Sequence, residues 1–412
     1  MKEKSVGSYL KKARTVVQKE GVLQVLIISL QKLQKSQYKK GSRKFDIMYS
    51  SLAATEDIMN LRMGSYKPPK PKGKKPPYTI NWVMSPPRGG GGHQNIFRFI
   101  DHLDAQGHKN NVYLYSTIDF LTVEQVRQNI SSYSKAKNVT IQWLDANGMK
   151  PADAVFATGW ETAYPVMNAK TDAQKLYFVQ DFEPYFYPVG SDYVLAENTY
   201  RFGFHGVTAG KWLAGKLNSD YGMTCDSYDF GADPGVYSFK NKGERKKVFF
   251  YARPVTTRRG FELGIMTLIK FHELKPDYEI VLAGWDVSEF NIPFPYTNLK
   301  ALPISALNDV YNECAAALVI SLTNMSLLPL ELLAAGTIPV VNNGKNNSEV
   351  SSLSFIKYAE PTPDSLAYAL KETVDRSNLP AYAAKAAESA KLLGWDVSCK
   401  KFEEVVERQI HG

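Results

Sequence analysis

The chain has 412 residues, of which 44% are hydrophobic and 22% are charged. These values are ordinary for a globular protein, and they exclude a largely disordered or collagen-like chain. The length exceeds what one hydrophobic core usually serves, so we expect two domains with extensions. The cysteines Cys225, Cys314 and Cys399 are far apart and lack a C-x-x-C spacing, which argues against a disulfide framework or a zinc site and favours the cytoplasm.

The net charge of +9 is concentrated at the N-terminus, where residues 1–44 hold twelve Lys or Arg and two acidic residues. The rest of the chain is nearly neutral, which argues against a nucleic-acid partner. Apolar residues recur there at helical spacing, at Leu23, Leu26, Ile27, Leu30 and Leu33. This pattern predicts a basic amphipathic helical extension over residues 1–65. Two interpretations stay open: residues 1–64 contact an anionic membrane surface peripherally, or the helix packs on the protein itself or on a second subunit of a homodimer.

Residues 66–77 contain five lysines and five prolines and are predicted to form an extended linker. After Tyr78, apolar runs of strand length alternate with segments of helical period, which indicates an α/β fold with parallel sheets. The expected strands are Thr79–Met84, Val112–Ser116, Thr140–Trp143, Ala154–Thr158, Leu176–Gln180, Gly206–Thr208, Lys247–Ala252, Glu279–Ala283, Ala317–Ser321, Ile338–Val341 and Phe355–Tyr358.

A stretch rich in Gly, Asp and Lys, residues 226–246, separates the two series of strands. We therefore expect two doubly wound Rossmann-like domains, over residues 78–235 and 236–395, whose sheets face a common cleft. Residues 396–412 are expected to form a C-terminal helix, either at the end of the second domain or crossing back to the first.

The segment from Ala317 to Val341 reads as a buried strand, a short loop and a helix that Ser326 could cap, with Gly336 just past its end. The free N–H groups at such a helix start suit a diphosphate. Glu331, one turn further in, could accept hydrogen bonds from the hydroxyls of a bound ribose. A solvated helix glutamate is the alternative interpretation.

This segment resembles retaining glycosyltransferases of the GT-B fold that carry an E-x7-E motif. Glu331 stands at the second glutamate of that motif, and Thr323 stands where the family has the first, which contacts the transferred sugar. The resemblance implies that Thr323, Ser326, Leu327 and Glu331 bind the donor. The departure at Thr323 makes the identity of the donor sugar the least predictable feature.

A second block, Lys247 to Gly260, is similar to the family's strand that is followed by cationic residues. By the same resemblance Arg253 and Arg259 neutralise the donor diphosphate, and Arg258 is a rival for the second position. Lys300 is expected near the base or the phosphates. Because no Asp-x-Asp occurs and arginines can stabilise the leaving group, we expect no metal and no cofactor.

In the first domain, four glycines at residues 89–92 follow the first strand, and the resemblance implies that Gly90 and Gly91 face the donor phosphates. Aromatic and acidic residues follow two further strands. Trp160, Phe182 and Tyr185 are candidates for stacking on acceptor sugars, with core packing as the alternative. Asp181 and Glu161 are the candidate catalytic bases.

The run from Gln180 to Phe204 resembles rhamnosyltransferases of bacterial cell-surface glycan assembly, of the WsaF type. That resemblance implies transfer of L-rhamnose from dTDP-β-L-rhamnose to a growing, lipid-linked rhamnan at the inner membrane face, with retention, as in S-layer glycan biosynthesis. A non-catalytic nucleotide-sugar-binding subunit and a transferase for another nucleotide sugar stay open. A nicotinamide-dependent epimerase or dehydrogenase is disfavoured, because the first glycine-rich loop is not G-x-G-x-x-G.

Overall fold

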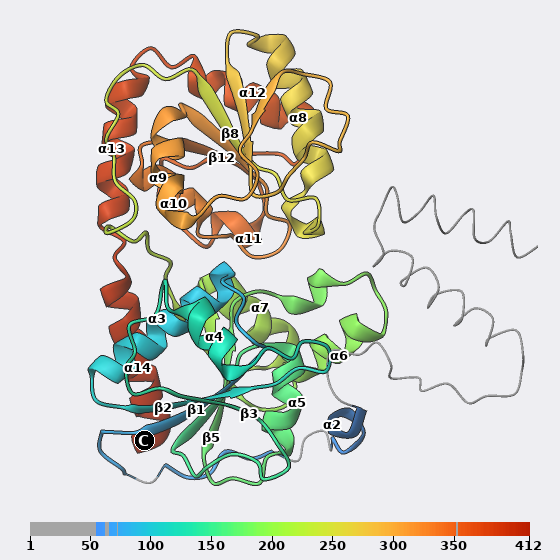
Figure 1. The fold of residues 1–412 in the computed structure, drawn as a ribbon, viewed down its shortest axis with the longest axis vertical. Helices are drawn as coiled ribbons and strands as arrows, with labels where there is room; N and C mark the ends of the chain where they lie inside the picture. Colours follow the sequence, from blue (N-terminus) through green and yellow to red (C-terminus); the bar gives the residue numbers. More distant parts are fainter. Residues whose placement is uncertain (1–54, 62–65, 72, 352) are drawn as a thin grey trace, which may run out of the picture. The chain divides into compact units, whose positions relative to one another are not determined.

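The computed structural model describes residues 55–61, 66–71, 73–351 and 353–412. Both sheets belong to one compact unit (Figure 1). The amphipathic helix expected near Leu23–Leu33 lies outside the described residues. Within the described part of the chain, no helix has the length and hydrophobicity needed to cross a bilayer.

The first sheet has seven strands in the order β3-β2-β1-β4-β5-β6-β7, and every pairing is parallel. Its strands are β1 Thr79–Met84, β2 Lys109–Leu114, β3 Thr140–Trp143, β4 Ala154–Ala157, β5 Gln174–Val179, β6 His205–Ala209 and β7 Cys225–Tyr228. Apolar residues cover both of its faces, since Trp82 of β1 packs in one core and its neighbour Val83 in the other. A sheet that is buried on both faces favours continuous hydrophobic runs in its central strands, as in β4, which reads Ala-Val-Phe-Ala and is buried throughout.

The second sheet has six strands in the order β10-β9-β8-β11-β12-β13, also parallel throughout. They are β8 Lys247–Tyr251, β9 Glu279–Ala283, β10 Tyr296–Asn298, β11 Ala316–Val319, β12 Ile338–Asn342 and β13 Lys357–Ala359. In both sheets the chain reverses its strand order beside the first strand, which is the doubly wound arrangement. The change of sheet falls between Tyr228 and Lys247.

All eleven expected strands are present, with bounds shifted by at most three residues. The sequence analysis missed β7 and β10. Both lie at sheet edges and both are poor in aliphatic side chains, reading Cys-Asp-Ser-Tyr and Tyr-Thr-Asn. An edge strand has a neighbour on one side only, so it needs less apolar surface and leaves a weaker signal in the sequence.

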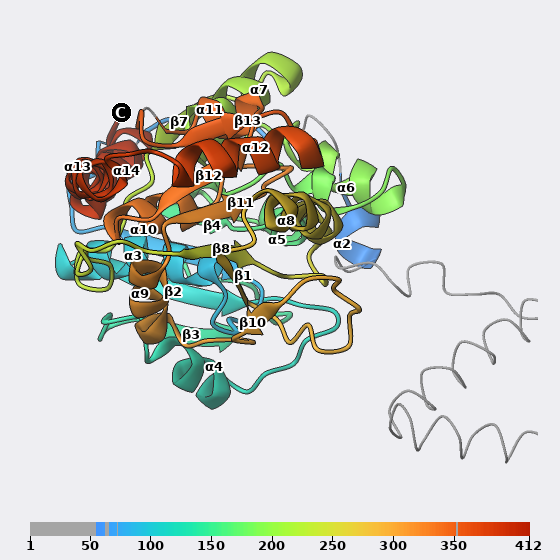
Figure 2. The same cartoon turned by 90° about the horizontal axis from the view of Figure 1, so that it is seen from above.

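Most crossovers between strands contain a helix, the exceptions being β3 to β4 and β9 to β10, and helices lie on both sides of each sheet (Figures 1 and 2). The α-helices are α2 Thr55–Met59, α3 Gly91–Ala105, α4 Val123–Ile130, α5 Trp160–Asn168, α6 Ser191–Thr199, α7 Lys211–Tyr221, α8 Phe261–Leu274, α9 Ile304–Glu313, α10 Leu328–Ala334, α11 Lys345–Ser348, α12 Pro363–Val374, α13 Leu379–Lys391 and α14 Trp395–His411. Two short 3-10 helices, η1 Glu183–Phe186 and η2 Thr257–Arg259, follow β5 and β8.

The C-terminal helix α14 packs on the first sheet, against α3 and β7, although it follows the second sheet in the chain (Figure 1). Its Phe402 is buried among aromatic rings, with ring centroids 4.7 Å from Phe99, 5.5 Å from Phe156 and 6.0 Å from Trp82. The two sheets are thus connected twice by the chain, once through residues 229–246 and once through the turn between α13 and α14.

The described residues of the 66–77 linker form neither helix nor strand, and they run along the first sheet. The hydroxyl of Tyr66 accepts a hydrogen bond from the backbone N–H of Lys175 at 3.0 Å. The carbonyl of Pro69 accepts one from the side chain of Gln174 at 2.9 Å. These contacts hold the linker beside the start of β5.

We predict that Phe402→Ala lowers the free energy of unfolding by about 3–5 kcal/mol, because it leaves a cavity among buried aromatic rings. Urea denaturation measures the change. Val397→Ala is the matched control in the same helix, since Val397 is 70% exposed and its truncation should cost less than about 0.5 kcal/mol. Equal effects of the two substitutions would contradict the packing of α14 on the first sheet.

Candidate functional site

A cavity of about 790 Å³ lies at the carboxyl ends of both sheets. From the first sheet it is lined by the loops after β1, β4 and β5, and from the second by the loops after β8, β9 and β11. Ligands of doubly wound folds bind at this edge of the sheet, because helix starts and free loop amides gather there. The volume suits a ligand of nucleotide-sugar size.

The glycine-rich loop forms one wall of the cavity, with Gly89, Gly90, Gly91 and Gly92 all among the lining residues. It leads directly into α3, whose N-cap is Gly90 and has no side-chain cap. The first N–H groups of α3 are therefore presented at the cavity edge, where they favour an anion. A Cβ atom built on Gly90 or Gly91 would meet nothing within 4 Å, so these glycines leave open space beside the backbone.

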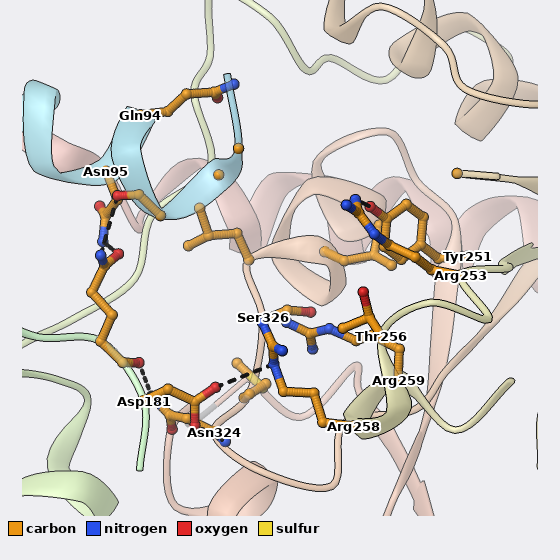
Figure 3. Close-up of a pocket in the computed structure, with 18 of the residues that line it drawn as sticks. Gln94, Asn95, Asp181, Tyr251, Arg253, Thr256, Arg258, Arg259, Asn324 and Ser326 are labelled. Atoms are coloured by element: carbon orange, nitrogen blue, oxygen red, sulfur yellow. Dashed lines mark hydrogen bonds and ion pairs between the residues drawn. The ribbon is translucent and has the colours of Figure 1, made fainter. Parts of the chain in front are cut away.

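Three arginines form the opposite wall: Arg253, Arg258 and Arg259, on the loop and 3-10 helix after β8 (Figure 3). The turn closes at Gly260, whose φ of 55° is unfavourable for other residues and whose Cβ position lies 2.6 Å from the Ile320 side chain. Glycine is thus required directly after Arg259 to bring this turn against β11.

Most hydrogen-bond partners of the three arginines are neutral groups. The side chain of Arg253 donates to the Tyr251 hydroxyl at 3.0 Å, and that of Arg259 donates to Ser321 Oγ at 2.9 Å. The buried Nε atoms of Arg253 and Arg258 have no hydrogen-bond partner among the described residues. Burial and the nearby charge of Arg258 lower the pKa of Arg259. An arginine stays protonated nonetheless, so the wall presents positive charge to a ligand.

Glu331 of α10 also lines the cavity, with Tyr237 and Tyr311 beside it. Burial raises the pKa of Glu331 to about 7, opposed by a hydrogen bond from Tyr237 and by the charge of Arg98. The rings of Tyr237 and Tyr311 stack at a centroid distance of 6.0 Å. Glu331 is therefore a half-buried hydrogen-bonding group inside the cavity, and the interpretation as a freely solvated helix glutamate is wrong.

Ser326 and Leu327 line the cavity just before α10. The expected capping role of Ser326 is wrong, because the helix starts at Leu328, its N-cap is Leu327, and no side chain caps it. The preceding turn is held instead from within the second sheet, since Ser321 Oγ donates to the carbonyl of Asn324 at 2.6 Å.

Asp181 and Thr323 meet across the boundary between the two sheets. The Thr323 hydroxyl donates to Asp181 Oδ2 at 2.8 Å, and the backbone N–H of Asn324 donates to Asp181 Oδ1 at 2.8 Å. Burial raises the pKa of Asp181, while these two hydrogen bonds and the charge of Arg258 lower it. Asp181 lines the cavity, whereas Thr323 is 1% exposed and does not.

Glu161 and Glu183 form a buried pair of carboxyl groups at the start of α5, beside Trp160. Glu183 accepts hydrogen bonds from the Trp160 backbone N–H at 2.5 Å and from the Tyr177 hydroxyl at 3.2 Å. Burial raises the pKa of both carboxyl groups, and the proximity of Glu161 raises that of Glu183 further. The pair can therefore hold a proton inside the cavity, in reach of a bound hydroxyl.

Four of the residues expected at the site lie outside the cavity lining: Thr323, which is buried between the sheets, and Lys300, Phe182 and Tyr185. Lys300 is outside the cavity lining and pairs with Asp286 on the surface at 3.0 Å; its neighbours Ala301 and Leu302 line the cavity in its place. Phe182 is 1% exposed and packs in the core of the first sheet, so the core-packing alternative holds for it. Tyr185 points to solvent beside Lys216, away from the cavity lining. Trp160, the third acceptor candidate, does line the cavity, and its indole N–H donates to the Tyr187 hydroxyl at 2.9 Å.

The structure adds lining residues that the sequence analysis did not select for the site: Asn95, Gln180, Thr256, Tyr237, Tyr311 and Asn324. Gln180 and Asn324 are adjacent in sequence to the predicted site residues Asp181 and Thr323, and this adjacency could have identified them. Tyr237 lies in the connection between the sheets, and Asn95 lies a turn into α3. No local pattern marks these two, because their position depends on how the sheets face each other.

We predict that Glu331→Gln stabilises the protein more at pH 8 than at pH 5. Because the pKa of Glu331 is raised in the folded state, its carboxyl group costs no stability below its ordinary pKa, near 4.5; the cost grows as the pH rises from there to about 7 and is constant above that. The difference in unfolding free energy between variant and wild type should grow by about 2 kcal/mol between these pH values. Chemical denaturation at both pH values measures it, with the exposed glutamate of α8 in Glu262→Gln as the control. An equal gain at pH 5 and pH 8 would contradict the burial of this carboxyl group.

Two domain models of one protein family and one curated protein match this chain. The model of the WsaF N-terminal domain matches residues 98–209 and the model of the WsaF C-terminal domain matches residues 246–371, which together cover more than half of the chain. The O-antigen biosynthesis protein RfbC of Myxococcus xanthus is 33% identical over 252 residues, 59% of this chain. The matched region is 20% of the length of RfbC.

Similar solved structures share the fold at low sequence identity. A glycosyltransferase from Rickettsia africae ESF-5 is 13% identical and has a TM-score of 0.56, covering 82% of this chain and 99% of its own. Anabaena Alr3699/HepE in complex with UDP-glucose is 10% identical with a TM-score of 0.61, covering 81% and 100%. The O-GlcNAc transferase of Thermobaculum terrenum is 12% identical with a TM-score of 0.58, covering 84% and 70%. With its two parallel sheets and both WsaF domains matched, the chain belongs to the WsaF family and has the GT-B fold of glycosyltransferases.

Proposed function

We propose that this protein is a glycosyltransferase that moves a sugar from a nucleoside diphosphate onto a growing bacterial surface glycan. The proposed donor is dTDP-β-L-rhamnose, the proposed acceptor is a lipid-linked rhamnan, and the transfer proceeds with retention and without a metal. Membership of the WsaF family supports the class of reaction. The relative RfbC is named for O-antigen biosynthesis, which supports a surface glycan as the product.

The observation that carries the proposal is the arginine wall of the cavity. Arg253, Arg258 and Arg259 converge from one turn, and the buried Nε atoms of the first two have no partner among the described residues. A diphosphate supplies oxygens for these donors and negative charge for the cluster. In transfer from a nucleotide sugar the diphosphate is also the leaving group, so cations placed here stabilise the charge that develops as the glycosidic bond breaks.

Glu331 supports a nucleoside beside the diphosphate. Its carboxyl group lies in the cavity with the Tyr237 hydroxyl as a partner, and it can accept a hydrogen bond from a sugar hydroxyl of the nucleoside. The apolar side chains of Leu302, Ile304 and Leu307 line the same part of the second sheet and offer a surface for a base. Anabaena HepE, which shares this fold, is known in complex with UDP-glucose.

The proposed chemistry is displacement on the same face of the sugar. The acceptor hydroxyl oxygen bonds to the anomeric carbon, the bond from that carbon to the diphosphate oxygen breaks, and the hydroxyl proton passes to the departing phosphate. No protein nucleophile is required in this scheme. Glu161 and Glu183 line the cavity from the first sheet, where their carboxyl groups can hold and orient hydroxyls of the acceptor.

Residues 1–64 are proposed to contact the inner face of the cell membrane peripherally. Their excess of Lys and Arg favours an anionic lipid surface, and a lipid-linked acceptor would be presented at such a surface.

We predict that Arg253→Ala weakens dTDP binding at least tenfold, because it removes a charged donor that faces the cavity. Lys300→Ala is the matched control, since Lys300 pairs with Asp286 outside the cavity and its loss should change the dissociation constant less than twofold. Isothermal titration calorimetry measures both. Similar losses for the two variants, or unchanged affinity in Arg253→Ala, would remove the arginine wall from the donor site.

The class of reaction and the donor are tested together. Saturation-transfer spectroscopy with dTDP, UDP and GDP sugars should give the strongest signal for dTDP-β-L-rhamnose, and a turnover assay with a rhamnan oligosaccharide should release dTDP at a rate that EDTA does not change. Binding without turnover would identify a non-catalytic subunit instead. Preference for UDP or GDP sugars would overturn the proposed donor while leaving the class of reaction intact.

A further inference from the structure

Four hydrogen bonds join the turn after β11 to the first sheet. Two of them end on the carboxylate of Asp181, from the Thr323 hydroxyl and the Asn324 backbone N–H, each at 2.8 Å. The other two come from the Asn324 side chain, which donates to the carbonyl of Gln180 at 3.0 Å and to that of Ala209 at 2.8 Å. We call Asp181, Thr323 and Asn324 the interdomain clasp.

Both sides of the clasp continue into the walls of the cavity. On the first sheet, the Gln180 side chain accepts a hydrogen bond from Asn95 at 3.0 Å and donates one to the carbonyl of Gly92 at 3.1 Å, in the glycine-rich loop (Figure 3). On the second sheet, Arg259 donates to Ser321 Oγ, which donates to the carbonyl of Asn324. Hydrogen-bonded neighbours thus run from the glycine-rich loop to the arginine wall.

Breaking part of this contact would cost free energy, because its polar groups are buried and would lose their partners. Thr323 is 1% exposed and Asn324 is 2% exposed, so separating the sheets would take from the Thr323 hydroxyl and the N–H groups of Asn324 the acceptors that they have in the closed arrangement. The oxygens of Asp181 are largely occupied, since Oδ1 also accepts from the Phe182 backbone N–H at 2.8 Å. A carboxylate with these partners is better placed to hold structure than to take a proton from an acceptor hydroxyl.

Arg258 reaches the clasp as well as the cavity. Its Nε lies 3.8 Å from Asp181 Oδ2, beyond hydrogen-bond distance, and its guanidinium group lies over the Phe186 ring of the first sheet at 4.2 Å. Asp181 therefore attracts Arg258 toward the boundary between the sheets without using up its donors. This arrangement holds a cavity cation in place while leaving it able to bind a phosphate.

We propose that Asp181 is a positioning residue: through Thr323 and Asn324 it closes the two sheets on each other and sets the distance between the glycine-rich loop and the arginine wall. A nucleoside diphosphate that binds both walls is then bound most tightly by the closed protein. Weakening the clasp lowers the closed population in the free protein, and the apparent affinity falls by the same factor. The inference rests on the proposed function only in taking a nucleoside diphosphate as the ligand.

Thr323→Val tests the clasp cleanly, because valine keeps the shape of threonine and Thr323 does not line the cavity. Thr323→Ser is the matched control, since it keeps the hydroxyl. Spin labels on the exposed Glu124 and Glu289, one on each domain, report the opening in double electron–electron resonance, with the native Cys225 changed to Ser. The measurement is made on the full chain, with and without dTDP.

We expect Thr323→Val to lengthen or broaden the distance distribution without dTDP, saturating dTDP to restore it, and the dissociation constant of dTDP to rise about tenfold. Thr323→Ser should match the wild type in all three respects. A distance distribution in free Thr323→Val that matches the wild type would overturn the proposal. The distances are measured without turnover, so a protein that proves not to be a transferase still gives a decisive result.

Asp181→Asn tests the same contact from the other sheet and serves if Thr323→Val does not fold. In the double variant Asp181→Asn/Thr323→Val the two substitutions should be non-additive, with a combined effect on dTDP affinity close to the larger single effect. Additive effects would show that the two residues act separately, and would contradict the clasp.

Discussion

The site depends on one constraint: every strand pairing that the structure describes is parallel, so all strands of a sheet end at the same edge. Parallel strands require a crossover connection, which contains a helix in most cases here, and each crossover returns the chain to the opposite edge before the next strand starts. The loops that follow β1, β4 and β5 therefore gather on one side of the first sheet, and those after β8, β9 and β11 gather likewise on the second. Residues that lie 60 or more positions apart become neighbours, as Arg259 and Ser321 do.

This arrangement divides the chemistry between the two sheets. The second sheet contributes the cations, the half-buried Glu331 and an apolar surface, which together suit a nucleoside diphosphate. The first sheet contributes the glycine-rich loop and the carboxyl pair of Glu161 and Glu183, where burial favours the protonated form. The cations of one wall suit a diphosphate and the carboxyl groups of the other suit hydroxyl groups, so the two walls can orient a polar donor and a hydroxyl-bearing acceptor in one cavity.

Contacts between the two sheets hold the two walls of the cavity in their relative positions. Asp181 extends from the first sheet into the turn that carries Thr323 and Asn324, and α14 returns from the second sheet to pack on α3. The buried hydrogen bonds select one arrangement of the two sheets, because each donor needs a specific acceptor. The aromatic packing of Phe402 stabilises that arrangement. Thr323, which stands where the E-x7-E pattern has its first glutamate, thus joins the two domains.

The sequence by itself determined the fold class, eleven of the strands and the place of the three arginines after a buried strand, because buried parallel strands need hydrophobic runs. It also determined that Glu331 follows a buried strand. Only the tertiary structure decided which side chains share the cavity. Lys300 and Tyr185 have suitable chemistry but turn to solvent, and Phe182 is taken up by the core. Tyr237 and Asn95 enter the cavity from segments without a local signal, because side-chain direction across a cavity depends on contacts between residues far apart in the chain.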